Sequence, residues 1–217
     1  MMRKHILFIL LYCSIASSTL AQKDYRLQKN QVLITAGYGF PSVLRFVLKL
    51  KTNREDFFIK GAGPFIFKAE YMASKRIGVG LNASYNYSVL YWYDTGYDTI
   101  QKNYHDFEFG IQGRELSGAI RVNYHFLQKS KFDMYGGIGI GTGIINLHSY
   151  SKAHTVNINL DYELPRPYYF DATVGARYFF TKNIGLYSEL GLGKSWLLYK
   201  KYFVPEAIIQ GGLSLRL

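Results

Sequence analysis

The residues of this chain best placed for catalysis are a histidine and the hydroxyls that follow it. His148 is followed by Ser149, Tyr150 and Ser151. A histidine two residues from a serine on one strand face could activate that hydroxyl for attack on an ester. Ser149 falls on the opposite face and Ser151 lies one residue too far along, so the spacing predicts no catalytic residue. We therefore expect a protein that is not an enzyme.

The sequence also lacks the patterns of metal and cofactor sites. The single cysteine, Cys13, lies near the start, and the histidines have no paired-ligand spacing. The glycine-rich stretch from Gly137 to Gly143 is not followed by a helix, as a dinucleotide loop would be. We expect no metal and no cofactor.

Charged side chains form a second group that could do chemistry, because they alternate with apolar residues and lie among small ones. Charges of both signs beside glycines suit a narrow space filled by ion pairs and make a poor pocket for an apolar ligand. The residues expected in this polar network are Lys68, Glu70, Arg121, His125, Asp171, Arg177, Glu189 and Arg216.

The first 21 residues have the organisation of a signal peptide. The basic pair Arg3-Lys4 precedes a short apolar run and then small residues up to Ala21. The run is far shorter than the roughly 20 residues of a spanning helix, so we expect cleavage after Ala21 and a single domain over residues 22–217. Cleavage lowers the formal charge from +11 to +9 (11 − 2 = 9). No nucleic-acid motif accompanies this charge, which favours contact with anionic membrane surfaces instead.

The elements that position the charged residues are expected to be strands. From Ile77 to Val89 every second residue is apolar and its neighbours are glycine, serine or asparagine, a pattern that puts the apolar residues on one strand face. Similar rows begin at Val32, Phe65, Leu116, Met134, Phe170, Ile184 and Ala207. Eight strands of this length suit a transmembrane barrel.

The connections between these rows alternate in length. Short polar turns are expected at 74–76, 128–130 and 181–183, and long loops at 44–60, 90–107, 146–167 and 195–205. Short turns at one end and long loops at the other are typical of outer-membrane barrels, with the turns in the periplasm. Both termini are then expected in the periplasm.

Periodicity alone also allows a soluble, lipocalin-like barrel with the apolar rows inside. Its surface would be largely glycine, which favours the membrane arrangement. Aromatic residues at the strand ends predict two interfacial girdles. The outer girdle would comprise Tyr85, Tyr87, Tyr91, Trp92, Tyr168, Tyr169, Trp196 and Tyr199, and the periplasmic one Tyr71, Tyr124, Phe126, Phe132, Tyr178 and Phe180.

The C-terminal segment looks like the signal read by the barrel-assembly machinery, with Gln210, Gly212, Leu215 and Leu217 at the key positions. Leu217 departs from the usual aromatic last residue. With the eight rows, residues 31–217 resemble the small bacterial outer-membrane β-barrel superfamily, including OmpA-like, opacity-type and PorT-like barrels. The resemblance implies an all-β fold, a closed antiparallel eight-stranded transmembrane up-and-down barrel.

An eight-stranded barrel is filled by its own side chains, so a general porin is not expected. We expect a structural or surface-interaction protein of the outer membrane, in contact with outer-membrane lipid and lipopolysaccharide and, during biogenesis, the assembly machinery. Two alternatives stay open: a lipid-modifying enzyme, and an accessory of secretion or envelope assembly with a partner there. The expected extracellular contact residues are Trp92, Tyr93, Tyr97, Tyr104, His148, Tyr150, His154, Lys200 and Lys201.

Overall fold

The computed structural model describes residues 26–40, 57–98, 102–152, 160–197, 200–202 and 209–217. These form nine strands: β1 (Val32–Phe40), β2 (Phe58–Met72), β3 (Ile77–Asp98), β4 (Asn103–Gln128), β5 (Phe132–Ser151), β6 (Leu160–Phe179), β7 (Ile184–Leu197), β8 (Lys200–Tyr202) and β9 (Ile209–Arg216). In the described ranges, no helix has the length and apolar character needed to cross a membrane.

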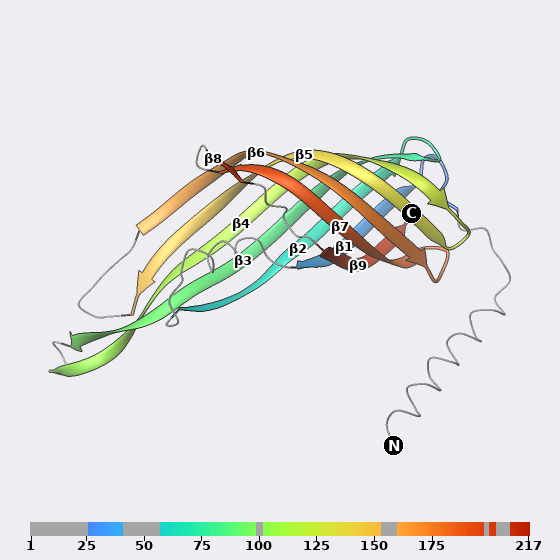
Figure 1. The fold of residues 1–217 in the computed structure, drawn as a ribbon. Coiled ribbons are helices and arrows are strands. Elements are labelled where there is room, and N and C mark those ends of the chain that lie inside the picture. Colours follow the sequence, from blue (N-terminus) through green and yellow to red (C-terminus); the bar gives the residue numbers. More distant parts are fainter. Residues whose placement is uncertain (1–25, 41–56, 99–101, 153–159, 198–199, 203–208) are drawn as a thin grey trace, which may run out of the picture.

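Eight of the strands pair in a closed ring. Each of β1 to β7 pairs antiparallel with the next strand along the chain. Strand β9 then pairs with β7 on one side and with β1 on the other, while the short β8 pairs, within the described ranges, with β7 alone. The predicted eight-stranded antiparallel barrel is thereby confirmed (Figure 1).

The apolar rows face outward and the polar rows face the bore. On β4, Leu116, Ile120 and Val122 are exposed, whereas Ser117 and Arg121 between them are buried. The same alternation runs through the other ring strands, so large aliphatic side chains cover the outside. This polarity is the reverse of that of a soluble lipocalin-like barrel.

The outward row of β4 also gives the height of the apolar band. It stays apolar from Leu116 to Phe126, ten residue steps (126 − 116 = 10), which is about 33 Å along a strand. At a tilt of about 40° the band is about 25 Å tall, the height of the apolar band of outer-membrane barrels. Beyond Leu116 the outward row becomes polar at Arg114 and Gln112. The hydrocarbon boundary on this strand therefore lies between Arg114 and Leu116.

Three tight turns close the other end of the barrel, where they were predicted. In two of them a hydroxyl caps the turn. Ser74 Oγ accepts from the backbone amides of Arg76 and Ile77, and Thr181 Oγ1 does the same for Asn183 and Ile184. Such local side-chain bonds favour a turn over a continued strand. Above these turns, Tyr71, Tyr124, Phe126, Tyr178 and Phe180 are exposed around the barrel.

At the opposite end, two of the long loops prove to be mostly strand, which corrects the prediction. β3 and β4 stay paired out to Asp98 and Asn103, and β5 and β6 extend to Ser151 and from Leu160. Outside the hydrocarbon the outward face need not be apolar, so the alternation is lost while the backbone pairing continues. Among the described residues, β3 pairs with β2 as far as Tyr91.

We call residues 92–98 and 103–108, the two-stranded end of β3 and β4, the ribbon. It projects beyond the rest of the barrel (Figure 1). The other two predicted loops, 44–60 and 195–205, lie largely outside the described residues. Within them, β2 begins at Phe58, β7 continues to Leu197 and β8 covers 200–202.

Candidate functional site

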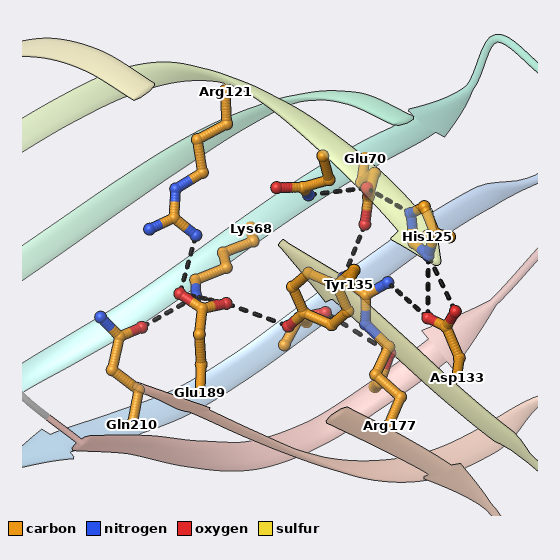
Figure 2. Close-up of polar contacts among 12 residues, drawn as sticks. Lys68, Glu70, Arg121, His125, Asp133, Tyr135, Arg177, Glu189 and Gln210 are labelled. Atoms are coloured by element: carbon orange, nitrogen blue, oxygen red, sulfur yellow. Dashed lines mark hydrogen bonds and ion pairs between the residues drawn. The ribbon is translucent and has the colours of Figure 1, made fainter. Parts of the chain in front are cut away.

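The bore is filled by hydrogen-bonded charged side chains, and Glu189 is the centre of one half (Figure 2). Lys68 Nζ lies 2.8 Å from both carboxylate oxygens, and Arg121 Nη1 donates to Oε1 at 2.8 Å. The Tyr135 hydroxyl donates to Oε2 at 2.9 Å. Arg121 also pairs with Asp171. One buried carboxylate thus joins β2, β4, β5 and β7.

Glu70 is the centre of the other half of the bore. It accepts from Arg177 Nη2 at 2.6 Å and from Asn123 Nδ2 at 2.7 Å. His125 lies between two carboxylates, with Nε2 3.1 Å from Glu70 and Nδ1 2.9 Å from Asp133. Arg177 Nη1 reaches Asp133 at 3.5 Å. Every charge in this half therefore faces an opposite charge.

Tyr135 connects the two halves. Its hydroxyl bonds to Glu189, and the Arg177 guanidinium lies 4.2 Å from the centre of its ring. Beside His125, the described part of the bore holds four cations and five carboxylates, so charges of both signs are nearly equal in number; these are Lys68, Arg121, Arg177, Arg216, Glu70, Glu115, Asp133, Asp171 and Glu189. Ion pairs of this density suit the narrow interior of an eight-stranded barrel.

All eight residues expected in the polar network face the bore. Seven of them take part in the contacts described above, and the eighth, Arg216, has its guanidinium 4.0 Å over the ring of Phe179. The sequence reasoning missed Asp133 and Tyr135. Both share the inward face of β5 with Gly137, so their spacing from that glycine was the available signal.

The predicted extracellular contact residues lie on strands rather than in loops, which is a correction. Trp92, Tyr93 and Tyr97 belong to β3, Tyr104 to β4, and His148 and Tyr150 to β5. Trp92 stacks on Phe109 with ring centres 6.2 Å apart. His154 lies outside the described residues, as do the side chains of Lys200 and Lys201, whose backbone forms β8.

The predicted outer girdle also needs a correction. Tyr169 is only 2% exposed and faces the bore, whereas Tyr168 is exposed. Neighbouring residues of a strand point to opposite faces, so the two could not share a girdle. Trp92 lies two residues after the buried Leu90 and therefore on the same, inward face of β3, not on the outward face that a girdle requires. The side chain of Trp196 and residue 199 lie outside the described part of the chain.

The predicted assembly-signal residues lie on β9 and just after it, at the seam of the ring. Gln210 faces the bore and accepts from Lys68 Nζ at 2.8 Å, while Leu215 and Leu217 are exposed on the outer face. Gly212 lies against β1, where an added Cβ would collide with the carbonyl oxygen of Ala36. The glycine at this position therefore allows the first and last strands to meet.

A glycine on β6 makes room for the tyrosine that connects the two halves of the bore. A Cβ on Gly175 would lie 2.5 Å from Tyr135 Cζ. We expect Gly175→Ala to displace the Tyr135 ring and lower the free energy of unfolding by about 1–3 kcal/mol, measured by urea titration in lipid vesicles. Gly118→Ala is the control, because its Cβ would meet nothing closer than Asn82 O at 3.8 Å; an equal loss there would contradict the packing argument.

A separate polar cluster joins β4 and β5 above the hydrocarbon boundary. Glu108 Oε1 accepts from the Tyr150 hydroxyl at 2.9 Å and from Lys152 Nζ at 3.0 Å. The hydrogen bond from Lys152 lowers the pKa of Glu108, and burial raises the pKa of Tyr150 to about 12. At neutral pH Glu108 is therefore ionised and Tyr150 is a donor, so the contact persists where the base of the ribbon leaves the barrel.

No metal site appears in the parts of the chain that the structure describes, where no group of three or more histidine, cysteine or acidic side chains could hold an ion.

Neither a protein-family model nor a curated protein sequence matches this chain. Among solved structures, it is similar to the outer membrane protein OprG from Pseudomonas aeruginosa, with 9% identity, 90% of this chain and 99% of that chain covered, and a TM-score of 0.49. It is similar to the N-terminal β-barrel domain of Pseudomonas aeruginosa OprF, with 14% identity, 88% and 100% covered, and a TM-score of 0.44. It is also similar to Ail, the attachment invasion locus protein of Yersinia pestis, with 11% identity, 88% and 100% covered, and a TM-score of 0.43.

With TM-scores below 0.5, these similarities carry no argument about the fold or the activity of this chain. The architecture rests on the chain's own features: a ring of eight antiparallel strands, a bore filled with paired charges and an apolar outer band of membrane height. The chain therefore forms an eight-stranded antiparallel barrel with the apolar outside and charged inside of a transmembrane barrel.

Proposed function

We propose that this chain is an integral outer-membrane protein whose barrel anchors a tyrosine-rich interaction surface outside the cell. The observation that carries the proposal is the contrast between the two ends of β3 and β4. Within the apolar band, β3 and β4 are part of the ring around a bore that buried ion pairs fill. A filled bore supports an anchor rather than a diffusion pore. Beyond the band they continue as the ribbon.

The ribbon has the composition of a contact surface. Tyr93, Tyr97 and Tyr104 are 51%, 48% and 73% exposed on its outward side, and Tyr97 packs edge-on against Tyr104 with ring centres 5.3 Å apart. Tyrosine offers a large, fairly rigid contact area with a polar tip and is enriched in binding surfaces for that reason. The ribbon also carries acidic side chains at Asp94, Asp98, Asp106 and Glu108.

The proposed orientation puts the ribbon in the medium and the tight turns in the periplasm, with lipid and lipopolysaccharide around the band. It can be tested with cysteines, because Cys13 lies in the expected signal peptide. We expect a membrane-impermeant maleimide to label Thr95→Cys on intact cells, since Thr95 is exposed on the ribbon. Lys129→Cys, exposed in a tight turn, is the matched control and should react only after the outer membrane is permeabilised.

The reverse labelling pattern would invert the orientation and remove the surface role. Recovery of the chain in the soluble periplasm, with no heat-modifiable migration after detergent extraction, would overturn the membrane placement itself.

A lipid-modifying enzyme is the second candidate, because His148 Nδ1 contacts Asp161, and a carboxylate-held imidazole could act as a base. Ser149 is not placed to be its nucleophile. The Ser149 hydroxyl donates to Leu160 O at 3.1 Å and accepts from Leu160 N at 3.2 Å. Because the Ser149 hydroxyl is already bonded to the backbone of Leu160, its geometry supports a protein that is not an enzyme. Release of fatty acid from phospholipid or lipid A that is abolished by His148→Ala would contradict this proposal.

A further inference from the structure

The outer face of β4, β5 and β6 carries a polar pocket of about 400 Å³ that the anchor role does not use. Its lining residues are Gln112, Arg114, Asn146, His148 and Asp161. They come from three neighbouring strands in register, with Arg114 opposite Asn146, and His148 opposite both Gln112 and Asp161. The volume falls within the range of small-molecule sites.

The pocket begins where the apolar band ends. One rung nearer the band, Leu116 pairs with Ile144, and the next outward rung is Arg114 with Asn146. A lipid lying against Leu116 would therefore place its headgroup at Arg114. Side chains at this level meet the part of a lipid that carries charge and hydroxyl groups.

The lining side chains are already oriented by their neighbours. With the Gln112 amide turned to satisfy both groups, its oxygen accepts from Arg114 Nε and Nη2 at 2.9 and 2.8 Å. This contact does not use Nη1, which has no hydrogen bond to the part of the chain that the structure describes. Asp161 engages His148 Nδ1, and among the described residues Nε2 of this ring has no hydrogen bond. A guanidinium with an imidazole and an amide beside it is suited to phosphate oxygens.

One acidic side chain of the pocket and a second on a neighbouring rung narrow the choice of ligand further. Asp161 lies on the His148 rung and Glu163 on the Asn146 rung. Carboxylates repel a headgroup that is only anionic, but they accept hydrogen bonds from hydroxyl groups. A phosphate next to a sugar satisfies both the guanidinium and the carboxylates.

From these contacts we propose that the pocket binds the phosphorylated sugar headgroup of an outer-leaflet glycolipid, with the phosphate on Arg114 and sugar hydroxyls on Asn146 and Asp161. The inference rests on the proposed membrane placement and gives the barrel a specific lipid partner. The acyl chains would lie along Leu116 and Ile144, within the apolar band.

The test uses the full chain purified in detergent micelles and fluorescent lipid A carrying two phosphates as the probe, with binding followed by anisotropy. Arg114→Gln should raise the Kd about tenfold or more, because it removes a charge-assisted contact. The matched control is Arg76→Gln, an arginine exposed at the opposite end of the barrel, which should leave the Kd within about twofold of the wild type. Unlabelled phosphatidylethanolamine and inorganic phosphate serve as competitors and should displace little probe.

Several results would overturn the inference. The first is an unchanged Kd for Arg114→Gln in a chain that still migrates as a folded barrel. The second is full displacement of the probe by inorganic phosphate, which would assign the pocket to free phosphate. The third is displacement of the probe by phosphatidylethanolamine as strong as by unlabelled lipid A. A folded barrel that ignores lipid A removes the pocket and leaves the anchor role standing. A chain that fails the cysteine-labelling and fractionation tests removes the anchor role instead.

Discussion

Replacement of Glu189 by alanine is expected to lower the free energy of unfolding of the barrel by about 3–5 kcal/mol. The change removes the acceptor shared by Lys68, Arg121 and Tyr135. Both cations are buried. Without Glu189, Lys68 would keep the neutral Gln210 as a partner and Arg121 would keep Asp171, so the lysine charge would have no carboxylate and little water to solvate it. The loss of unfolding free energy is measured by urea titration in phospholipid vesicles, with heat-modifiable migration on a gel as the readout of the folded fraction.

Two further variants show whether this loss comes from buried charge. Glu108→Ala also removes a paired carboxylate, but one above the hydrocarbon boundary, and should have little effect on unfolding. Adding Lys68→Met to Glu189→Ala should recover part of the loss, because one of the uncompensated charges is removed as well. A loss below about 1 kcal/mol for Glu189→Ala would mean that water reaches the centre of the bore.

The second large effect concerns the outer face. Ile120→Arg should destabilise the barrel by about 2–4 kcal/mol in a bilayer, because it puts a charge near the middle of the apolar band. Leu116→Arg, at the edge of the band on the same row, should cost about 0–1 kcal/mol. The pair is well matched, since Leu116 is 57% and Ile120 58% exposed, so only their depth in the membrane differs. The measurement is equilibrium unfolding in vesicles.

Equal costs for the two arginine variants would contradict the position of the hydrocarbon boundary between Arg114 and Leu116. A cost at Leu116 larger than that at Ile120 would move the band along β4 toward the ribbon.

Within the membrane, the fold could be predicted from the sequence because two solvents act on each strand. Hydrocarbon outside and paired charges inside force an alternation of apolar and polar residues that any strand of the ring must show, as in Ile77 to Val89. Beyond the boundary this constraint ends. Thr95 and Asp106 face the same side of the ribbon, where the Thr95 hydroxyl donates to Asp106 at 2.8 Å. Neither side chain is apolar, and aspartate is depleted in strands, so the alternating pattern is absent here.

The members of the bore network were predictable, but their pairing was not. Inward-facing charges can be identified from the period of each strand, whereas contacts between strands depend on the register and tilt of the whole ring. Lys68 and Glu189 are 121 residues apart in the chain, yet they form one ion pair. Asp133 was overlooked because the inward row of β5 continues as glycines, which made that face look empty of charge.

The seam between β1 and β9 has a consequence for how the chain folds. Thr35 and Ser214 lie side by side across it, with their hydroxyl oxygens 3.4 Å apart, although the two residues are 179 positions apart in sequence. Joining ends so distant has an entropic cost that grows with the logarithm of the separation, and contacts of this range make folding slow. Until the eight residues of β9 are in place, β1 and β7 both present unsatisfied backbone edges that can recruit foreign strands. Pairing of the last strand with β1 and β7 therefore closes the ring, and it ends the period in which the nascent barrel is prone to aggregation.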